Sequence, residues 1–427
     1  MTQLDSTAQV RRRRIITATA LAAVLVLTGA GCGTIPPADG ATAPGGSSGT
    51  QAPAGPTNAT PANTPSSTPT PDPVTFTPNV ADKAKNVKVS TVVAVKAANG
   101  TVGSVKLSYK GTDSKGNAIK GTVDGTLAKD KTHWTADDRL EPGATYTLTV
   151  TGKNPEGTVT TTKSTFKTQA LTLQQQTYAQ LQPLKGSHVG VGMPVILTFD
   201  VPVKNRKEFE KHLKVTSSPK QVGTWSWFSD KEVHFRPKKY WKPGTKVKVT
   251  ADLNGLDAGN GIYGQNSTST SFTIGRSVIT KINLRSHQAK VYIGGELERT
   301  IPISAGKPGW QTRSGTKLIM EKLPVTRMTN EMIGAEESYD LRVKYAMRVT
   351  WSGEFLHAAP WNAGYLGRVN ASHGCVGMST ANAAWLFSRV QIGDPVVTTG
   401  SSRGLEKGNG YTDWDVSWSQ YKKGSAL

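Results

Sequence analysis

Hydrophobic and polar residues alternate along two similar stretches in the middle of the chain. Leu140–Thr149 and Trp241–Thr250 each contain a Pro-Gly pair near their start. Each continues as a run in which every second residue is apolar or β-branched. A period of two predicts a strand with one buried face, and the Pro-Gly pair predicts a turn before it. The copies are spaced by about the length of one immunoglobulin domain. The repeat therefore predicts two immunoglobulin-like β-sandwiches, at 75–168 and 169–275.

The sequence pattern changes after residue 276 and predicts a third, β-rich domain at 276–400. Ser277–Leu284 and Ala289–Ile293 are predicted strands, and a glycine-rich turn region begins at Gly306. Met320–Tyr339 is a longer polar segment, interpreted as a flap. Shorter strand-like runs follow it, at Tyr345–Trp351 and Glu354–His357. The expected fold class is mostly β: two sandwiches followed by a β-rich domain with a short helix after Cys375.

Two further features concern the sandwiches and the end of the chain. His133 and His234 stand at equivalent positions of the repeat, so both are interpreted as structural. Trp414 and Trp418 in the tail (401–427) are four residues apart, the spacing of one apolar stripe on a helix. We expect this tail to pack on the third domain.

The N-terminus carries a basic cluster, Arg11–Arg14, and then an apolar run, Ile15–Leu27. As a helix this run is only about 20 Å long, too short for a bilayer core of roughly 30 Å. It is typical of a signal peptide at 1–31. Small residues precede Cys32 as in a bacterial lipobox, although Gly29 stands where Leu is usual. We expect Cys32 to be lipidated; the alternative is ordinary secretion with cleavage near Ala30.

Residues 33–74 are rich in Thr, Pro, Ser, Ala and Gly and contain no Lys or Arg. Such a composition cannot bury enough apolar surface to offset the entropy of ordering the backbone. With Cys32, this segment (32–74) is predicted to be a lipidated, disordered tether. The chain is therefore expected to be exported and anchored to the cell membrane, facing the cell wall or periplasmic space.

Composition excludes several classes of protein. The chain has 427 residues, only 2 Cys, and a net charge of +21 from 51 Lys+Arg against 30 Asp+Glu. Two cysteines are too few for a disulfide framework or a cysteine-based zinc or iron–sulfur site. One long apolar run excludes a polytopic membrane protein. The basic charge favours residence near anionic polymers and lipid headgroups, and with no nucleic-acid-binding motif we expect no nucleic-acid partner.

The chemistry of the sequence is concentrated around Cys375, which is the one cysteine beyond the N-terminal segment. A helix-favouring run begins at Ser379, a candidate N-cap, so the helix dipole is expected to stabilise the Cys375 thiolate. A cysteine nucleophile needs a base, and His373 and His357 are the nearest histidines before it. A turn through Gly374 can aim backbone N–H groups at an oxyanion. The non-catalytic alternative is that Cys375 is a buried free cysteine beside surface histidines.

The run Ser372-His373-Gly374-Cys375, with His357 upstream and Ser379 downstream, resembles the active-site signature of the L,D-transpeptidases. The strands at 278–293 and the Gly306–Gly309 turn are also similar to the catalytic domain of that family. The resemblance covers roughly 277–399, and the order of lipobox, tether, immunoglobulin-like modules, catalytic domain and tail is similar to that of family members.

This resemblance implies peptidoglycan cross-linking with no cofactor and no metal. Cys375 would attack the carbonyl of the third residue of a donor tetrapeptide stem and release the terminal D-Ala. The side-chain amine of an acceptor stem would then resolve the thioester into a 3→3 cross-link. Carbapenem-type inhibitors would be expected to acylate Cys375. The implied partners are donor and acceptor stems and, through Cys32, the membrane; the chain is expected to be a monomer.

The resemblance also assigns the site residues. His357 matches the general acid/base, and His373 with Gly374 matches the oxyanion and positioning turn. Matches to the substrate cleft are Tyr339 (a flap tyrosine that helps hold the donor), Ser352, Gly353, Trp361 and Ser372. Ala358 stands where the family orients this base, and only its backbone carbonyl can serve. One position clearly departs from the family: Gly377 stands where Asn or Arg is frequent, which removes a side-chain contact to the substrate and bears on donor or acceptor preference.

Two other functions stay open from the residues. One is a hydrolase with the same nucleophile, acting as a carboxypeptidase or endopeptidase on stem peptides. The other is a non-catalytic wall-binding lipoprotein whose third domain is a relic. Acceptor dependence separates a transferase from a hydrolase, and the effect of Cys375→Ala separates both from a binding protein. For the sandwiches themselves, a spacer role is the default interpretation.

Overall fold

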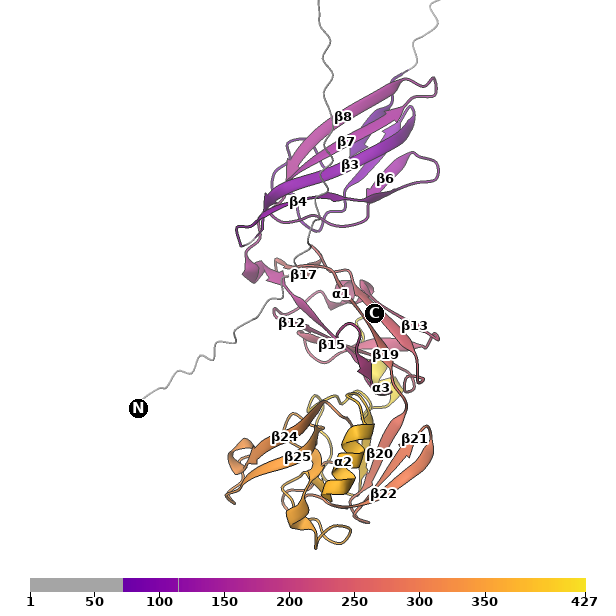
Figure 1. Ribbon diagram of the computed structural model, residues 1–427. Coiled ribbons are helices and arrows are strands. Elements are labelled where there is room, and N and C mark those ends of the chain that lie inside the picture. The colour runs from indigo at the N-terminus through magenta and orange to yellow at the C-terminus, as the bar shows by residue number, and fades with distance from the viewer. Residues whose placement is uncertain (1–71, 114) are drawn as a thin grey trace, which may run out of the picture. The chain divides into compact units, whose positions relative to one another are not determined.

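The computed structural model describes residues 72–113 and 115–427. The predicted signal peptide (1–31), Cys32 and nearly all of the predicted tether lie outside these residues. The described part consists mostly of β-strands, as the alternating pattern predicts (Figure 1). Within it, no helix combines the length and apolarity needed to cross a bilayer.

The first module is a sandwich of two antiparallel sheets. Their strand orders are β1-β2-β6-β5 and β4-β3-β7-β8. The strands are β1 (Thr75–Pro78), β2 (Ala94–Ala98), β3 (Thr101–Thr112), β4 (Ala118–Val123), β5 (Gly125–Leu127), β6 (His133–Ala136), β7 (Ala144–Lys153) and β8 (Val159–Lys167).

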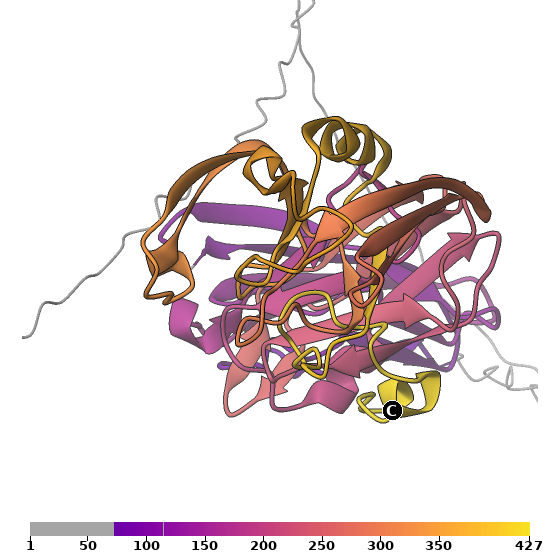
Figure 2. The same cartoon turned by 90° about the horizontal axis from the view of Figure 1, so that it is seen from below.

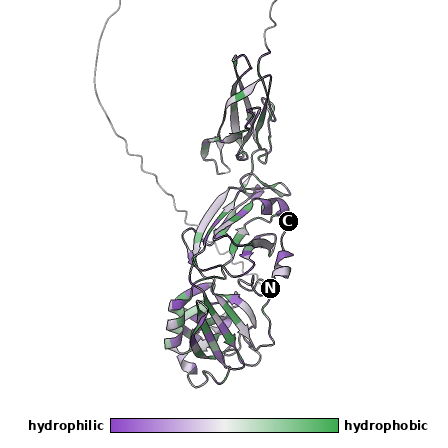
Figure 3. Cartoon of the chain, turned by 90° about the vertical axis from the view of Figure 1, so that its right-hand side faces the viewer, coloured by the Kyte–Doolittle hydropathy of each residue, from purple (hydrophilic) through white to green (hydrophobic). Residues whose placement is uncertain are grey.

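Alternation along these strands builds the core of the first module. In β7 every second residue, from Ala144 to Val150, is buried, and the residues between them face outward. Tyr146 stacks on Phe166 of β8, with ring centroids 5.1 Å apart. The mixed colours along the strands in Figure 3 reflect the same alternation. His133 is exposed in this module, in contrast to its counterpart in the repeat.

The second module repeats this plan with extra short elements. Its sheets have the orders β10-β12-β15-β14, β11-β19-β16-β13 and β17-β18-β9. The elements are η1 (Leu173–Gln175), β9 (Gln176–Thr177), β10 (Ala179–Gln182), β11 (His188–Val189), β12 (Val195–Phe199), α1 (Arg206–Lys211), β13 (Leu213–Ser218), β14 (Gly223–Trp227), β15 (Glu232–Pro237), β16 (Lys246–Ala251), β17 (Asp257–Gly259), β18 (Ile262–Gly264) and β19 (Thr268–Ile274).

The third domain is built on one nine-stranded sheet, ordered β23-β28-β20-β21-β22-β27-β26-β25-β24. Its elements are β20 (Val278–Asn283), β21 (Gln288–Ile293), β22 (Glu296–Ser304), β23 (Gly315–Leu318), β24 (Glu321–Thr329), η2 (Asn330–Met332), β25 (Asp340–Arg348), β26 (Phe355–Ala358), η3 (Pro360–Asn362), β27 (Val376–Met378), α2 (Thr380–Arg389) and β28 (Pro395–Thr399). The segment interpreted as a flap, Met320–Tyr339, contains β24 and η2 and is one arm and the turn of a hairpin whose other arm is β25.

Helix α2 covers part of this sheet. Ser379 is its N-cap, and its side chain accepts a hydrogen bond from the Asn382 N–H. Ala383 and Leu386 are buried, and the helix packs against β25 and β26. In Figure 2 this helix is seen nearly end-on, beside the strands of the third domain. The helix therefore supports the strands that carry the candidate chemistry.

The tail was expected to pack on the third domain, and this prediction is only half right. The tail as far as Asp415 does contact that domain, but α3 (Trp418–Lys422) and its flanks pack on the second module. The Trp414 indole donates to the Gly192 carbonyl at 2.7 Å. Trp414 and Trp418 form no apolar stripe, because both rings lie against the Arg236 guanidinium, which is almost fully buried.

A buried ion pair joins the tail to the second module. His234 Nδ1 lies 2.9 Å from Asp413, and its Nε2 lies 2.8 Å from Glu232. Burial lowers the pKa of His234, but the charges and hydrogen bonds of these two carboxylates outweigh it and raise the pKa to about 9. The imidazole is therefore a cation at neutral pH. The structural role inferred for His234 has a defined partner in the tail.

Candidate active site

Two parallel strands place the candidate nucleophile and base at the wall of the same cavity. Strand β26 pairs with β27 so that His357 is opposite Gly377. Cys375 immediately precedes β27. Both side chains line a cavity of about 560 Å³ between the sheet and the flap hairpin. The cavity is also lined by these residues predicted from the sequence: Tyr339, Ser352, Gly353, Trp361, Ser372 and His373. Of the predicted set, Gly374 alone is not among the lining residues.

His357 is buried, and its orientation is set by the backbone. Its Nδ1 lies 2.9 Å from the Ala358 carbonyl oxygen, so Nδ1 carries the hydrogen and Nε2 is free to accept a proton. Burial lowers the pKa of His357, and the bond to the Ala358 carbonyl opposes this only in part. The imidazole also stacks on Trp361, with centroids 6.0 Å apart. His357 is therefore a neutral, oriented base near pH 7.

The Cys375 thiol donates to the Gly353 carbonyl oxygen at 3.5 Å. The residue is partly exposed to the cavity, while surrounding protein desolvates its sulfur. Desolvation raises the pKa of the thiol to about 12, although the Phe355 N–H and the charge of Arg348 act in the opposite direction. The expected thiolate stabilisation by the helix is wrong, because β27 separates Cys375 from the start of α2. The resting sulfur is thus a neutral thiol.

The turn before Cys375 is held by its own hydrogen bonds. The Ser372 hydroxyl donates to the Cys375 carbonyl at 2.6 Å and accepts from the Gly374 N–H at 3.1 Å. Gly374 has φ +121°, a region that side chains disfavour. The Thr312 hydroxyl donates to the Gly374 carbonyl at 2.7 Å. In this state the Gly374 N–H, expected to serve an oxyanion, is occupied by Ser372.

His373 faces the flap rather than the thiol. Its ring stacks on Tyr339 at 5.3 Å and meets the edge of Trp310 at the same distance. Its Nε2 is 3.0 Å from a Glu337 oxygen, close enough for an ion pair but without hydrogen-bond alignment. Glu337 also pairs with Lys307. His373 therefore links the Cys-containing turn to the flap, which leaves His357 as the candidate for the acid/base position.

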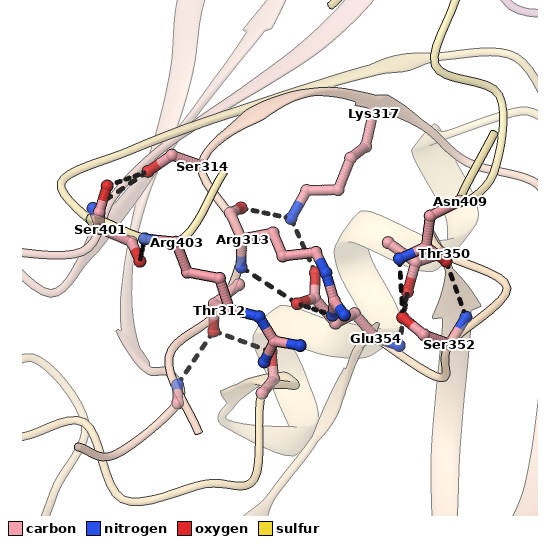
Figure 4. Close-up of polar contacts among 12 residues, drawn as sticks. Thr312, Arg313, Ser314, Lys317, Thr350, Ser352, Glu354, Ser401, Arg403 and Asn409 are labelled. Atoms are coloured by element: carbon pink, nitrogen blue, oxygen red, sulfur yellow. Dashed lines mark hydrogen bonds and ion pairs between the residues drawn. The ribbon is translucent and has the colours of Figure 1, made fainter. Parts of the chain in front are cut away.

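A buried ionic cluster lies beneath the Ser352–Glu354 loop (Figure 4). One Glu354 oxygen accepts from the backbone N–H and the guanidinium of Arg313, each at 3.0 Å. The other oxygen accepts from Lys317 Nζ at 2.9 Å, and Lys317 also donates to the Arg313 carbonyl. The Thr350 hydroxyl accepts from the Glu354 N–H. This cluster fixes the loop that leads into β26 and His357.

The tail contacts the same loop from outside. The Ser352 N–H donates to Asn409 Oδ1, and Asn409 Nδ2 donates to the Ser352 hydroxyl, both at 2.9 Å. Glu406 pairs with Arg313 and accepts from Asn409. Gly353 next to Ser352 has φ +96°, which the loop requires to turn its carbonyl toward Cys375. The tail therefore holds the loop that contacts the candidate nucleophile.

Gly377 has a packing reason to be glycine. A Cβ built at this position would lie 2.8 Å from the Ala359 Cβ. Both atoms are attached directly to backbone, so neither can rotate away. The structure adds this steric constraint to the lost side-chain contact inferred from the sequence.

Sequence reasoning missed several residues of the site. Glu354, Arg313 and Lys317 are charged, and no periodic pattern predicts that a charge is buried. Asn409 and Glu337 come from segments with no motif of their own. One signal was available: Glu354 directly follows the Ser352-Gly353 pair that the resemblance singled out.

Comparison with known proteins gives separate evidence for the family of this chain. A family model described as the L,D-transpeptidase catalytic domain matches residues 277–398, and one described as a bacterial Ig domain matches residues 84–257. L,D-transpeptidase 2 of Mycobacterium tuberculosis (strain CDC 1551 / Oshkosh) is 32% identical over 356 residues, which cover 82% of this chain and 85% of the relative. L,D-transpeptidase 5 of Mycobacterium tuberculosis (strain ATCC 25618 / H37Rv) is 33% identical over 362 residues, covering 83% and 77%.

A solved structure of the LD transpeptidase LdtMt1 in complex with imipenem shares 33% identity and has a TM-score of 0.46. It covers 52% of this chain and 98% of that one. The identity and coverage of the two curated relatives are sufficient to assign the family. The chain belongs to the L,D-transpeptidase family, whose members cross-link peptidoglycan.

Proposed function

We propose that this chain forms 3→3 cross-links in peptidoglycan through a thioester on Cys375. The observation that carries the proposal is the pairing of β26 with β27. It brings a neutral thiol into the same cavity as a histidine whose Nδ1 is already bonded to the Ala358 carbonyl. A nucleophile, a base and a backbone group that orients the base are the elements that acyl transfer needs.

The proton balance follows from the two perturbed groups. Because burial raises the pKa of Cys375 and lowers that of His357, the resting pair is neutral thiol and neutral imidazole. As sulfur attacks the carbonyl carbon of the third stem residue, its proton passes to His357 Nε2. The C–N bond then breaks, and the terminal D-Ala leaves as an amine with that proton.

The second half-reaction reverses these transfers. The acceptor amine attacks the thioester, His357 takes a proton from the nitrogen, and the C–S bond breaks as the thiol is restored. The turn at Ser372–Cys375 would supply backbone donors to the oxyanion in both steps, once the Gly374 N–H is released from Ser372. Tyr339, Ser352 and Trp361 line the same cavity as the thiol and would hold the stems.

Intact mass spectrometry tests this proposal directly. The full chain mixed with a tetrapeptide stem should gain the mass of the donor less D-Ala, whereas Cys375→Ala should gain nothing. His357→Gln should bind donor but acylate at least a hundredfold more slowly, as expected for loss of a general base. Imipenem, found with LdtMt1, should add its mass to the wild type alone.

The remaining outcomes decide between functions. Adding an acceptor stem should convert the adduct into a cross-linked dimer. Free acid without dimer would identify a hydrolase. A folded wild-type chain that forms neither adduct nor product would contradict the catalytic proposal and favour a wall-binding protein.

We also propose that the chain is exported and anchored through Cys32, on the basis of the N-terminal sequence. Two acyl chains on one cysteine give stable membrane attachment. Cys32→Ser should move the protein from the membrane fraction to the soluble exported fraction. Retention of the variant in the membrane fraction would refute the anchor.

A further inference from the structure

The outward face of one sheet in the first module is dominated by lysine, serine and threonine, with Val159 exposed at one end. Strand pairing aligns its side chains in rows that cross β3, β7 and β8. In strand order, the rows are Lys110–Thr145–Lys167, Ser108–Thr147–Thr165, Lys106–Thr149–Lys163 and Ser104–Thr151–Thr161. The edge strand β4 adds Lys120 opposite Lys110 and Thr122 opposite Ser108.

This face concentrates positive charge at a cost in stability. Lys110 and Lys120 are cross-strand neighbours, about 5 Å apart at the backbone, and like charges so placed destabilise a sheet. Lys106 and Lys163 flank β7, with roughly 10 Å between their backbones. Within the described residues, none of the face lysines forms an ion pair. Asp82 accepts hydrogen bonds from the N–H and hydroxyl of Thr165, so one carboxylate borders this face on β8, between Lys163 and Lys167; the Lys110–Lys120 pair lies on β3 and β4.

The second module repeats the same composition on the equivalent strands. Its rows across β13, β16 and β19 are Ser218–Lys246–Thr273, Thr216–Lys248–Ser271 and Lys214–Thr250–Ser269. The outward positions of these rows contain no carboxylate and no aromatic residue. Packing requires only that the inward positions be apolar, so it does not explain why the outward positions agree in both modules.

Each face also has a shallow hollow at its corresponding end row. In the first module the hollow has a volume of about 680 Å³ and is lined by Lys110, Lys120 and Lys167. In the second module it has a volume of about 490 Å³ and is lined by Lys246, Lys248 and Ser218. Lysine ammonium groups around a hollow can bind an anion, and the hydroxyls beside them can bond to sugar or peptide groups.

We propose that these two faces, Lys106/Lys110/Lys120/Lys163/Lys167 and Lys214/Lys246/Lys248, bind the carboxylates of peptidoglycan strands. The modules then hold the enzyme on its polymeric substrate. The outward rows offer no aromatic ring for stacking on a neutral sugar and no apolar centre for a protein partner. Charge complementarity therefore favours a polyanion, and the proposed function makes peptidoglycan the polyanion closest to the enzyme; the proposal rests on that function.

Sedimentation with purified sacculi tests the binding without turnover. The full chain carrying Cys375→Ala should co-sediment with native sacculi and lose most binding when their carboxylates are amidated. Three variants are compared in this background. The first-face variant is Lys106→Gln, Lys110→Gln, Lys120→Gln, Lys163→Gln and Lys167→Gln. The second-face variant is Lys214→Gln, Lys246→Gln and Lys248→Gln. A charge-matched control in the first module is Lys85→Gln, Lys88→Gln, Lys115→Gln, Lys129→Gln and Lys131→Gln.

The first-face variant should bind native sacculi about tenfold more weakly than the control at physiological salt, because several screened contacts each contribute a little. The second-face variant should also bind native sacculi more weakly than the control. Because its substitutions lie in the other module, misfolding of the first module cannot explain that result. With active Cys375, both should acylate a soluble tetrapeptide at the wild-type rate, which separates failure of binding from failure of catalysis. Equal loss in the control, or binding that survives amidation, would overturn the proposal.

Discussion

Glu354→Gln is the most informative single substitution in this molecule, because it changes one charge and almost no volume. Glu354 is 4% exposed, and Arg313 and Lys317 are 7% and 1% exposed. Its two oxygens receive three hydrogen bonds from these partners. A glutamine would keep one acceptor and turn an N–H₂ group toward a buried cation.

The expected loss of stability can be worked from these contacts. Removing one member of a buried ion pair costs about 3–5 kcal/mol, since the other charge is left unpaired. Arg313 retains Glu406, and Lys317 retains the Arg313 carbonyl. We therefore expect the low end, about 3 kcal/mol of unfolding free energy, which is roughly a hundredfold in the folded-to-unfolded ratio.

Hydrogen exchange during urea titration measures this loss in the right place. Peptides from β26 and β28 report unfolding of the catalytic domain separately from that of the modules. Glu321→Gln is the matched control, because Glu321 pairs with Arg348 at 3.0 Å on the surface, where such a pair contributes at most about 1 kcal/mol. If both variants lose the same small amount, the idea that the Glu354 cluster holds the loop is wrong.

Three further predictions follow from the site and the tail. Asn409→Ala should slow acylation by about tenfold with little change in donor affinity, because two hydrogen bonds to the Ser352 loop are lost; an unchanged single-turnover rate would refute this. His234, with its folded pKa raised to about 9 from 6.5, stabilises tail docking fully below pH 6.5, and this support should fade as the pH rises through 9. Limited proteolysis of the tail across that range checks the direction, and Asp413→Asn should weaken the pH dependence, because only Glu232 then raises the pKa of His234. Gly377→Ala should lower the melting temperature and the rate together, because the new Cβ meets Ala359; a wild-type melting curve would contradict the clash.

Much of the fold could be predicted because its signals are local. The alternation in β7 and β16 and the Ser379 N-cap of α2 are each encoded within a few neighbouring residues. Partners distant in sequence could not be predicted this way. His234 meets Asp413 across 179 positions of chain, and nothing near either residue indicates the other.

In the candidate site, too, local signals could be predicted and effects of packing could not. The Ser-His-Gly-Cys run and His357 predicted a candidate nucleophile and base by residue type and order, and Cys375 and His357 do line one cavity. The ionisation state of Cys375 was predicted with the wrong sign. Sequence proximity to a helix suggested a stabilised thiolate, whereas desolvation, which depends on the packed surroundings, dominates and raises the pKa.

The neutral thiol has a consequence for the durability of the enzyme. Peroxides and other oxidants react with thiolates, and a thiol whose pKa is near 12 is almost never ionised at neutral pH. The Cys375 thiol, hydrogen-bonded to the Gly353 carbonyl, is thus unreactive toward oxidants between turnovers. It becomes nucleophilic only when a substrate carbonyl is in place to receive it. In the exported location proposed above, such a centre would persist where no cytoplasmic reductant repairs it.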